Sequence, residues 1–513
     1  MKSTKILDCT LRDGGYYTLW DFDSQLVDSY YDAMENLPID YVEIGYRSPA
    51  LPGYYGEFFY CPESVMKKAK AAMPSKKLAV LLDAKNIELD KLEDILKPCK
   101  PYITLIRIAV APASFDKAVA LAKAIKPMGY EIAFNVMYMS DWLKNPNFLS
   151  GLSEIEGLVN FFYMVDSYGG VTPAEVAELA KEVQSRASLN LAFHGHNNLE
   201  LGLINTLTAI ENGCQMVDST ITGMGRGAGN LKTELLLTYL AAKSDIDINF
   251  NKLATVVEKF EDLNKSHNWG TSLPYMVSGS QSLPQKQVME WIAKNTYSID
   301  SIVTALKNQS SNLEDKLYPT FSPTKKHTSC LIIGGGPSPV NHQEALVSYL
   351  NAHPDTCVIH ASSKNAYVLQ AVKNTQYFCL IGNEGYRMSE VFNQEWSHFN
   401  HTCVLPPSPR EMGTFVPKAL VSKTQELEAI SFIDKHHDSP LILALETALA
   451  LGCNEISLVG YDGYSKNVTQ REIELAEQNE AALLALSARG IRANSLVNTI
   501  YKNLDTKSLY SEI

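Results

Sequence analysis

The chain has 513 residues, a hydrophobic content of 45%, a charged content of 20% and a formal net charge of -12. This length exceeds what one hydrophobic core organises, so we expect two or three domains with the composition of an ordinary globular protein. The negative charge argues against general affinity for nucleic acid or for an anionic membrane as partners. Nine cysteines without a C-x-x-C pair favour reduced, buried thiols. With neither a secretion signal nor a bilayer-spanning apolar run, the expected location is cytoplasmic.

Short apolar runs recur through the first 245 residues, and helix-like segments separate them. The predicted strands cover residues 6–8, 41–44, 78–82, 105–110, 131–136, 161–165, 190–193 and 216–219. The clearest helices are predicted at 114–128 and 172–187, and the second opens with Thr172-Pro173, an N-cap residue followed by proline in the first turn. Eight such units favour a closed (β/α)₈ TIM barrel. Periodicity alone leaves an open, doubly wound sheet as the alternative.

Polar residues gather at the carboxyl ends of these strands, where barrels of this kind place their active sites. They are Arg12, Asp13, Glu43, Arg107, Asn135, Asp166, Ser167, His194, His196 and the loop 223–230. Because closure brings the eighth strand beside the first, Asp13 and the two histidines are expected to be neighbours. Both imidazoles of a His-x-His pair on a strand project from one face. The combination predicts a divalent-metal site that also holds an anionic substrate.

Five motifs in this region identify a family. They are Thr10-Leu11-Arg12-Asp13-Gly14, Val42-Glu43-Ile44-Gly45, Asp166-Ser167-Tyr168-Gly169-Gly170, His194-Gly195-His196-Asn197-Asn198 and Gly223-Met224-Gly225-Arg226-Gly227-Ala228-Gly229-Asn230. Through them, residues 1–290 resemble the metal-dependent aldolase and lyase superfamily. That superfamily contains hydroxymethylglutaryl-CoA lyase, isopropylmalate and homocitrate synthases, and 4-hydroxy-2-oxovalerate aldolase.

The resemblance implies a metal centre made by Asp13, His194 and His196. Asn230 is a further candidate ligand, with capping of the following helix as its alternative role. Mn²⁺ is the expected cofactor, and Mg²⁺, Co²⁺ and Zn²⁺ accept the same donors. In this family the ion binds a 2-oxo acid such as pyruvate and stabilises the enolate that forms when a carbon–carbon bond breaks or forms.

The same resemblance suggests roles for residues around the metal. Arg12 is expected to offset negative charge on the keto oxygen, and Ser167 to hydrogen-bond the 2-oxo acid. Arg226 is expected to hold substrate, with a solvated loop charge as its alternative. Glu43 is either catalytic or a partner of Arg12 or Arg107, and Arg107 is a further candidate for substrate binding.

Two departures from the named relatives concern the chemistry. The 4-hydroxy-2-oxovalerate aldolases have a histidine base three residues after the aspartate, where this chain has Tyr16. A phenol with a pKa near 10 is a weak base, so Tyr16 is expected either to act as an acid/base or substrate contact, or only to wall the site. Hydroxymethylglutaryl-CoA lyase has a cysteine in the loop after the eighth strand, and here that loop has Arg226 and no cysteine.

The rest of the chain predicts three further segments after the barrel at 1–245. A helical extension at 246–317 is expected to form a lid or a dimer contact, and 318–328 is a linker. Residues 329–513 predict a Rossmann-like α/β domain. Its expected strands cover 330–333, 356–360, 377–381, 402–405 and 455–459. Its clearest helix is expected at 440–451.

Two short motifs of this last domain suggest a ligand. Ile333-Gly334-Gly335-Gly336-Pro337-Ser338 and Ser457-Leu458-Val459-Gly460-Tyr461-Asp462 are similar to a Rossmann-like family that includes an archaeal pterin pyrophosphokinase and motility accessory factors linked to sugar transfer. The similarity implies a nucleotide, nucleotide-sugar or other phosphorylated ligand. Gly334, Gly335, Gly336 and Ser338 would lie near phosphate, and Asp462 near a ribose, a sugar or a metal. The alternative is a tight turn whose glycines pack strand against helix.

The leading prediction is a metal-dependent aldolase or carbon–carbon lyase that acts through a metal-bound enolate of pyruvate or another 2-oxo acid, with an aldehyde as second substrate. The second domain adds the hypothesis of a role in surface-sugar metabolism. One alternative is an acyl-CoA condensing enzyme or lyase, and another is a non-catalytic, metal-bound scaffold or sensor. A homo-oligomer is expected.

Overall fold

The computed structural model describes residues 4–144, 146–244, 246–294, 297–311, 318–408, 410, 414–465 and 468–513. The chain forms two compact units, Met1–Met289 and Glu290–Ile513. Among the helices in the described part of the chain, none is long and apolar enough to cross a membrane. The boundaries predicted above for the barrel, the helical extension, the linker and the last domain stay predictions.

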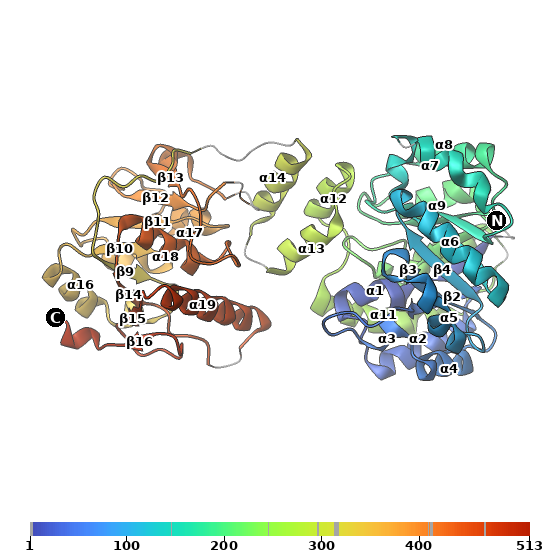
Figure 1. The fold of residues 1–513 in the computed structure, drawn as a ribbon, viewed down its shortest axis with the longest axis horizontal. Helices are drawn as coiled ribbons and strands as arrows, with labels where there is room; N and C mark the ends of the chain where they lie inside the picture. Colours follow the sequence, from blue (N-terminus) through green and yellow to red (C-terminus); the bar gives the residue numbers. More distant parts are fainter. Residues whose placement is uncertain are drawn as a thin grey trace. The chain divides into compact units, whose positions relative to one another are not determined.

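Eight parallel strands close into a barrel in the first unit, which confirms the predicted TIM-barrel fold (Figure 1). They follow chain order, and β8 pairs with β1, so that Asp8 lies opposite Ser219. Each predicted strand overlaps an observed one. The strands are β1 (Lys5–Asp8), β2 (Tyr41–Tyr46), β3 (Lys77–Asp83), β4 (Leu105–Val110), β5 (Glu131–Val136), β6 (Phe161–Asp166), β7 (Leu191–Gly195) and β8 (Met216–Ser219).

Helices surround the barrel and cover the outer faces of its strands. Helix α8 begins where the sequence predicts, because Thr172 and Glu175 form a capping box and Pro173 occupies the first turn. The helices between and after the strands are α1 (Thr10–Thr18), α2 (Ser24–Asn36), α3 (Glu57–Tyr60), α4 (Glu63–Ala72), α5 (Leu92–Leu96), α6 (Phe115–Ile125), α7 (Pro146–Ser150), α8 (Pro173–Arg186), α9 (Gly202–Glu211) and α10 (Thr233–Lys243). Four more follow along the chain, namely α11 (Phe250–His267), α12 (Leu273–Ser280), α13 (Gln285–Lys294) and α14 (Ile299–Ser310), and the last of them belongs to the second unit.

The inside of the barrel is built in layers, because every second residue of a strand points inward. The deeper layer is apolar and contains Leu7, Tyr41, Ala79, Leu105, Ala133, Ala192 and Met216. Two residues further along five of the strands, a buried polar residue follows: Glu43, Arg107, Asn135, His194 and Asp218. The apolar layer thus supports a polar layer at the carboxyl end, and that layer positions the site.

The second unit holds a parallel eight-stranded sheet in the order β13-β12-β11-β10-β9-β14-β15-β16. The five predicted strands are present, and three short ones, β13, β15 and β16, were not predicted. A run of two or three residues is too short for alternation to reveal. The strands are β9 (Ser329–Ile333), β10 (Cys357–His360), β11 (Gln376–Cys379), β12 (Thr402–Leu405), β13 (Thr424–Glu426), β14 (Glu455–Val459), β15 (Ala493–Ser495) and β16 (Asp505–Thr506).

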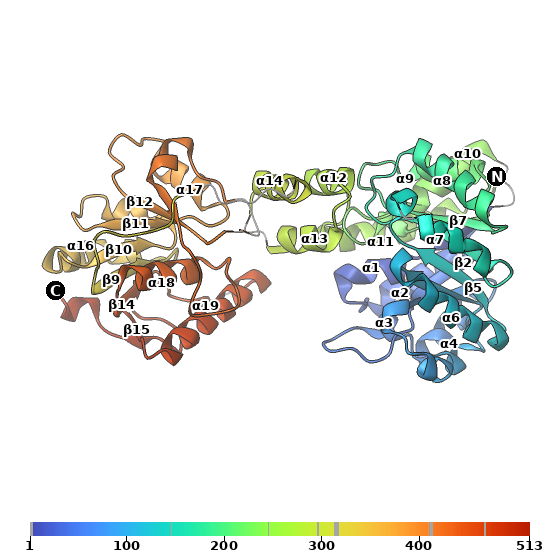
Figure 2. The same ribbon diagram turned by 45° about the horizontal axis from the view of Figure 1, so that its top comes forward.

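Helices pack on both faces of this sheet, which makes three layers (Figure 2). Cys330 and Ile332 of β9 share a core with leucines of α18 and α19, whereas Leu331 and Ile333 face α16. The winding direction reverses between β9 and β14, so this point is the topological switch of the sheet. The helices are α15 (Ser338–Asn341), α16 (Gln343–Ala352), α17 (Glu384–Val391), α18 (Pro440–Leu451) and α19 (Gln470–Ala488).

Candidate active site at the carboxyl end of the barrel

The predicted metal ligands converge in the first unit. Asp13, His194 and His196 each place one ligand atom within 4.8 Å of the others. Asp13 lies in the first turn of α1, directly after β1, while His194 belongs to β7 and His196 follows that strand. All three side chains are buried. Barrel closure therefore joins residues that lie more than half a domain apart in the chain.

Each histidine is oriented by a hydrogen bond at one ring nitrogen. His194 Nδ1 lies 2.8 Å from Asp218 Oδ2, and His196 Nδ1 lies 2.7 Å from the carbonyl oxygen of Asp166. A histidine that binds a metal usually has its other ring nitrogen bonded to such a carboxylate or carbonyl group. In both rings Nε2 is therefore left for a metal. Burial, together with the charges of His194 and Arg226, lowers the pKa of His196 to about 3. This imidazole is neutral, as a ligand must be.

Asp13 is held as a carboxylate. Burial raises its pKa, but Arg12 and the two imidazoles outweigh that effect and bring the pKa well below its usual range. Arg12 Nη1 donates to Asp13 Oδ1 at 2.6 Å, and Asn230 Nδ2 donates to Asp13 Oδ2 at 2.5 Å. Asn230 does not cap α10, which begins at Thr233. Its buried Oδ1 has no hydrogen-bond partner among the described residues, and a cation beside Asp13 would satisfy it.

These donors fit a divalent cation. One carboxylate, two imidazoles and an amide oxygen form a mixed nitrogen and oxygen set that Mn²⁺, Mg²⁺, Co²⁺ and Zn²⁺ all accept. A divalent metal at Asp13, His194 and His196 therefore matches the residues present. The choice of ion is not fixed by this set.

A buried ionic network supports the ligands from below. Arg12 Nε donates to Glu43 Oε2 at 2.7 Å, and Arg107 Nη1 lies 3.0 Å from the same oxygen. Arg107 also pairs with Asp218 and stacks 4.2 Å above the ring of Tyr163. Two guanidinium groups and three carboxylates, counting Asp13, leave a formal charge of -1. A divalent cation would make it +1, which suits a substrate with one negative charge.

Glu43 and Arg107 both contact other charged side chains of this network. Arg107 is 0% exposed, and its guanidinium faces Glu43, Asp218 and the Asn135 Oδ1 at 3.0 Å. These contacts place Arg107 as a support of His194 through Asp218, and a substrate contact of Arg107 stays a prediction. Glu43 pairs with both arginines, the structural alternative considered for it.

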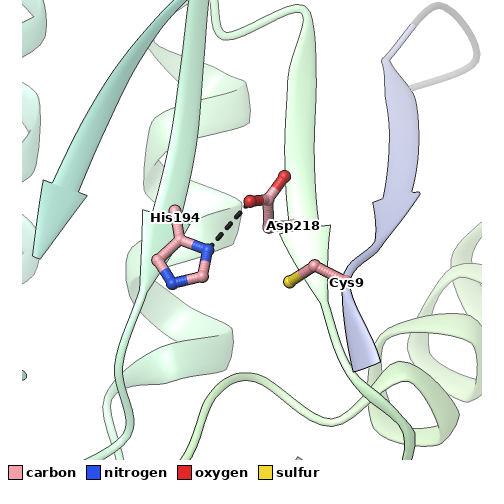
Figure 3. Close-up of side chains that lie close together, drawn as sticks. All are labelled: Cys9, His194 and Asp218. Atoms are coloured by element: carbon pink, nitrogen blue, oxygen red, sulfur yellow. Dashed lines mark hydrogen bonds and ion pairs between the residues drawn. The ribbon is translucent and has the colours of Figure 1, made fainter. Parts of the chain in front are cut away.

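Asp218 is the functional residue that sequence reasoning missed. Figure 3 shows it on β8, between His194 of β7 and Cys9 after β1. Its only signal is an acidic residue inside a buried strand. The three side chains could also group around a metal. Asp218 already binds Arg107, so the Asp13 group is the better site.

Several further polar side chains lie at the carboxyl end of the barrel. Ser167 Oγ accepts a hydrogen bond of 2.9 Å from the Tyr138 N–H, so its own O–H remains able to donate to a substrate. Tyr138 itself is left-handed, with φ of 61°, a strained conformation typical of functional sites. Tyr16 Oη lies 3.1 Å from Tyr46 Oη, and burial raises the pKa of Tyr46 well above 10.

In the second unit the structure brings Gly334, Gly336, Ser338 and Asp462 together at the switch point. Gly334 N donates to Val459 O at 2.8 Å and Gly336 N to Gly460 O at 2.9 Å. Asp462 Oδ2 accepts from Ser338 Oγ at 3.1 Å. Two of the three glycine amides are thus bonded within the protein, and a carboxylate lies beside Ser338. Phosphate binding by this turn, including Gly335, stays a prediction. A Cβ atom would meet close contacts at Gly334 and Gly336, which is consistent with the alternative of a packed turn.

Comparison with known proteins assigns the barrel to a family. The HMGL-like family matches residues 3–259, and the chain belongs to it. The chain is a metal-dependent enzyme of the lyase and aldolase class, as the five motifs predicted. The resemblance of the second domain to Rossmann-like pyrophosphokinases stays a prediction.

Individual relatives cover the same region. A 4-hydroxy-2-oxovalerate aldolase of Carboxydothermus hydrogenoformans is 28% identical over 262 residues, which are 50% of this chain and 77% of that protein. An oxaloacetate decarboxylase of Mycobacterium tuberculosis is 26% identical over 245 residues, 47% of this chain and 71% of that protein. A crystal structure of the N-terminal domain of a protein provisionally described as an aldolase, from Bacteroides vulgatus, is 51% identical with a TM-score of 0.56 and covers 59% of this chain and 99% of that one.

Proposed function

We propose that the barrel cleaves a 4-hydroxy-2-oxo acid into pyruvate and an aldehyde, or joins them in the reverse direction. The observation that carries the proposal is the convergence of Asp13, His194 and His196, with Arg12 bonded to one of them. Relatives named 4-hydroxy-2-oxovalerate aldolase support the pyruvate half of the reaction. Mn²⁺ is the proposed ion.

The residues around the centre suit an enolate. A bound divalent cation would supply a Lewis acid for the keto oxygen of the 2-oxo acid. Arg12 adds a fixed positive charge close by, because Asp13 and Glu43 hold its guanidinium on two sides. Ser167 donates its free O–H to the 2-oxo acid. Since these groups are buried and already oriented, they need little reorganisation when negative charge develops.

One of the two proton steps, protonation of the enolate carbon, is assigned to Tyr16. Cleavage requires removal of the 4-hydroxyl proton and later protonation of the enolate carbon. Tyr16 shares a hydrogen bond with Tyr46, so the two hydroxyl groups can pass a proton between the site and its rim. A phenol, with an ordinary pKa near 10, acts more readily as the acid than as the base. We therefore assign to Tyr16 the protonation of the enolate carbon.

Exchange of the pyruvate methyl protons tests this proposal without knowledge of the aldehyde. Protein loaded with Mn²⁺ or Mg²⁺ is incubated with pyruvate in D₂O, and the methyl signal is followed by NMR. Metal-dependent loss of the signal, absent in His194→Ala, is the expected result. No exchange with confirmed metal occupancy would exclude the pyruvate reaction and leave acyl-CoA chemistry or a metal-bound scaffold.

Decarboxylation of oxaloacetate is a second candidate, because one relative carries that name. Loss of carbon dioxide from oxaloacetate also leaves the enolate of pyruvate, so exchange alone does not separate the two reactions. Turnover of oxaloacetate against 4-hydroxy-2-oxovalerate does. The surface-sugar setting, the nucleotide or nucleotide-sugar partner, the homo-oligomer and the cytoplasmic location remain proposals. If added nucleotide sugars cause no thermal shift, the surface-sugar setting and the nucleotide or nucleotide-sugar partner are contradicted.

A further inference from the structure

The glycine-rich loop after β8 presents one charged side chain toward the mouth of the barrel. A Cβ atom on Gly225 would lie 2.4 Å from Asn230 Nδ2 and 3.0 Å from Asp13 Oδ2. Gly227 has φ of +67°, and a Cβ atom there would lie 2.7 Å from Gln285 Oε1. The backbone on both sides of Arg226 is therefore fixed by close contacts. Arg226 is held beside the metal ligands by this loop.

The surroundings of Arg226 belong to the site. Its guanidinium lies 5.5 Å from the centre of the Tyr16 ring. Its charge also acts on two other side chains there: it helps to lower the pKa of His196 and it opposes the rise in the pKa of Tyr168. Arg226 thus lies over the ring of the proposed acid, and its charge reaches one of the metal ligands.

Arg226 differs from neighbouring cations because it forms no ion pair with a carboxylate of the described residues. Arg12 pairs with Asp13 and Glu43, and Lys85 pairs with Asp83 at 3.1 Å. Among the described residues, Arg226 takes part in no ion pair, and its Nε is buried without a hydrogen-bond partner. A half-buried guanidinium with an unsatisfied donor is costly unless a ligand supplies the acceptor.

We infer that Arg226 binds a carboxylate on the second substrate, so the aldehyde partner of pyruvate is itself an acid. This inference rests on the proposed function. The formal charges of the buried network, the divalent cation and the 2-oxo acid sum to zero. The positive charge of Arg226 is therefore left for one further negative charge on the substrate. A carboxylate supplies one charge, whereas a phosphate carries nearly two. The planar guanidinium also matches the two oxygens of a carboxylate.

Binding of matched 2-oxo acids tests the inference. The full-length, Mn²⁺-loaded protein is titrated by calorimetry with 2-oxoglutarate and 2-oxoadipate, which have a distal carboxylate. The matched probes, 2-oxovalerate and 2-oxohexanoate, have the same chain lengths without it. We expect at least one dicarboxylate to bind about 30-fold more tightly than its partner. No preference at either length would overturn the inference.

Variants assign the preference to the residue. Arg226→Met should reduce the preference to below about 3-fold and leave the affinity for the monocarboxylates nearly unchanged, since only the distal contact is lost. Arg226→Lys should keep part of it. Arg186→Met is the matched control, because Arg186 lies on α8 and pairs there with Glu182. A preference that persists in Arg226→Met would overturn the assignment.

The outcome is separable from that of the proposed function. Pyruvate exchange without a preference for dicarboxylates would leave the pyruvate chemistry in place and overturn the role of Arg226. A preference without exchange would support the anion contact and overturn the pyruvate aldolase reaction.

Discussion

The two parallel sheets of this protein both gather polar groups beyond the carboxyl ends of their strands, but they use them differently. In the barrel, hydrogen bonds to Asp218 and Asp166 occupy one nitrogen of each histidine and leave the other for a ligand. At the switch point of the second sheet, Gly334 N and Gly336 N donate to backbone carbonyls, and Asp462 accepts from Ser338.

The difference shows what identifies a binding site at such an edge. Topology places both edges where ligands commonly bind, but only polar groups that the fold leaves without a partner can bind a ligand. The barrel has such groups in its predicted metal ligands and at Arg226, whereas the groups of the second edge described above are bonded to each other. The comparison can be tested by removing groups from each edge.

The largest effect is expected from His194→Ala. Loss of a direct ligand should weaken Mn²⁺ binding at least about 100-fold and reduce pyruvate exchange at least as much, since loss of a second-shell partner alone costs 10- to 100-fold. Binding is measured by electron paramagnetic resonance titration. His436→Ala, an exposed residue of the second unit, is the control. Equal Mn²⁺ affinity in both variants would contradict the ligand assignment.

Arg107→Met should destabilise the barrel. The substitution leaves Glu43 and Asp218 buried without their shared cation, and breaking a buried pair costs about 3–5 kcal/mol in free energy of unfolding. Urea unfolding of the full chain measures it. The matched variant Arg186→Met removes an exposed helix pair and should cost less than about 1 kcal/mol. A similar loss in both variants would show that the network contributes little to stability.

Most of the barrel could be predicted from the sequence, because each strand is a short buried run between helices. The ligand trio could be predicted because His-x-His and Arg-Asp mark two strand ends that closure brings together. Asp218 could not, since its role depends on a register that no local pattern contains. The charge of Arg107 suggested a substrate contact, but whether a charge faces a ligand or another side chain is decided by packing across the barrel.

Gly336→Ala and Gly335→Ala distinguish packing from ligand binding at the second edge. A Cβ atom on Gly336 would lie 2.1 Å from Asp462 Oδ2 and 2.7 Å from Gly460 O, whereas on Gly335 the nearest atom is 3.6 Å away. Gly336→Ala should therefore lower the free energy of unfolding by about 1–3 kcal/mol, and Gly335→Ala by less than about 0.5 kcal/mol. If both are neutral in urea unfolding, packing does not explain the glycines and the phosphate hypothesis gains support.

A buried histidine of the second sheet sharpens the contrast with the metal ligands. His360 Nε2 lies 2.8 Å from Gln376 Oε1, and its ring stacks on Phe378 at 4.3 Å. Burial, helped by the charge of His401 and opposed by the Gln376 hydrogen bond, lowers its pKa from 6.5 to about 4. His360 is thus neutral in the folded protein, as His196 is, but it faces an amide and an aromatic ring instead of a carboxylate.

This lowered pKa makes the stability of the second unit depend on pH. Between pH 6.5 and about 4 the unfolded chain binds a proton at His360 that the folded chain does not, so the free energy of unfolding falls as the pH falls. Each pH unit in this window costs about 1.4 kcal/mol, or about 2 kcal/mol from pH 7 to pH 5. In His360→Asn that part of the loss should disappear, whatever its stability at pH 7, while pyruvate exchange stays unchanged. An identical pH dependence in urea unfolding of both proteins would show that His360 is not the titrating group.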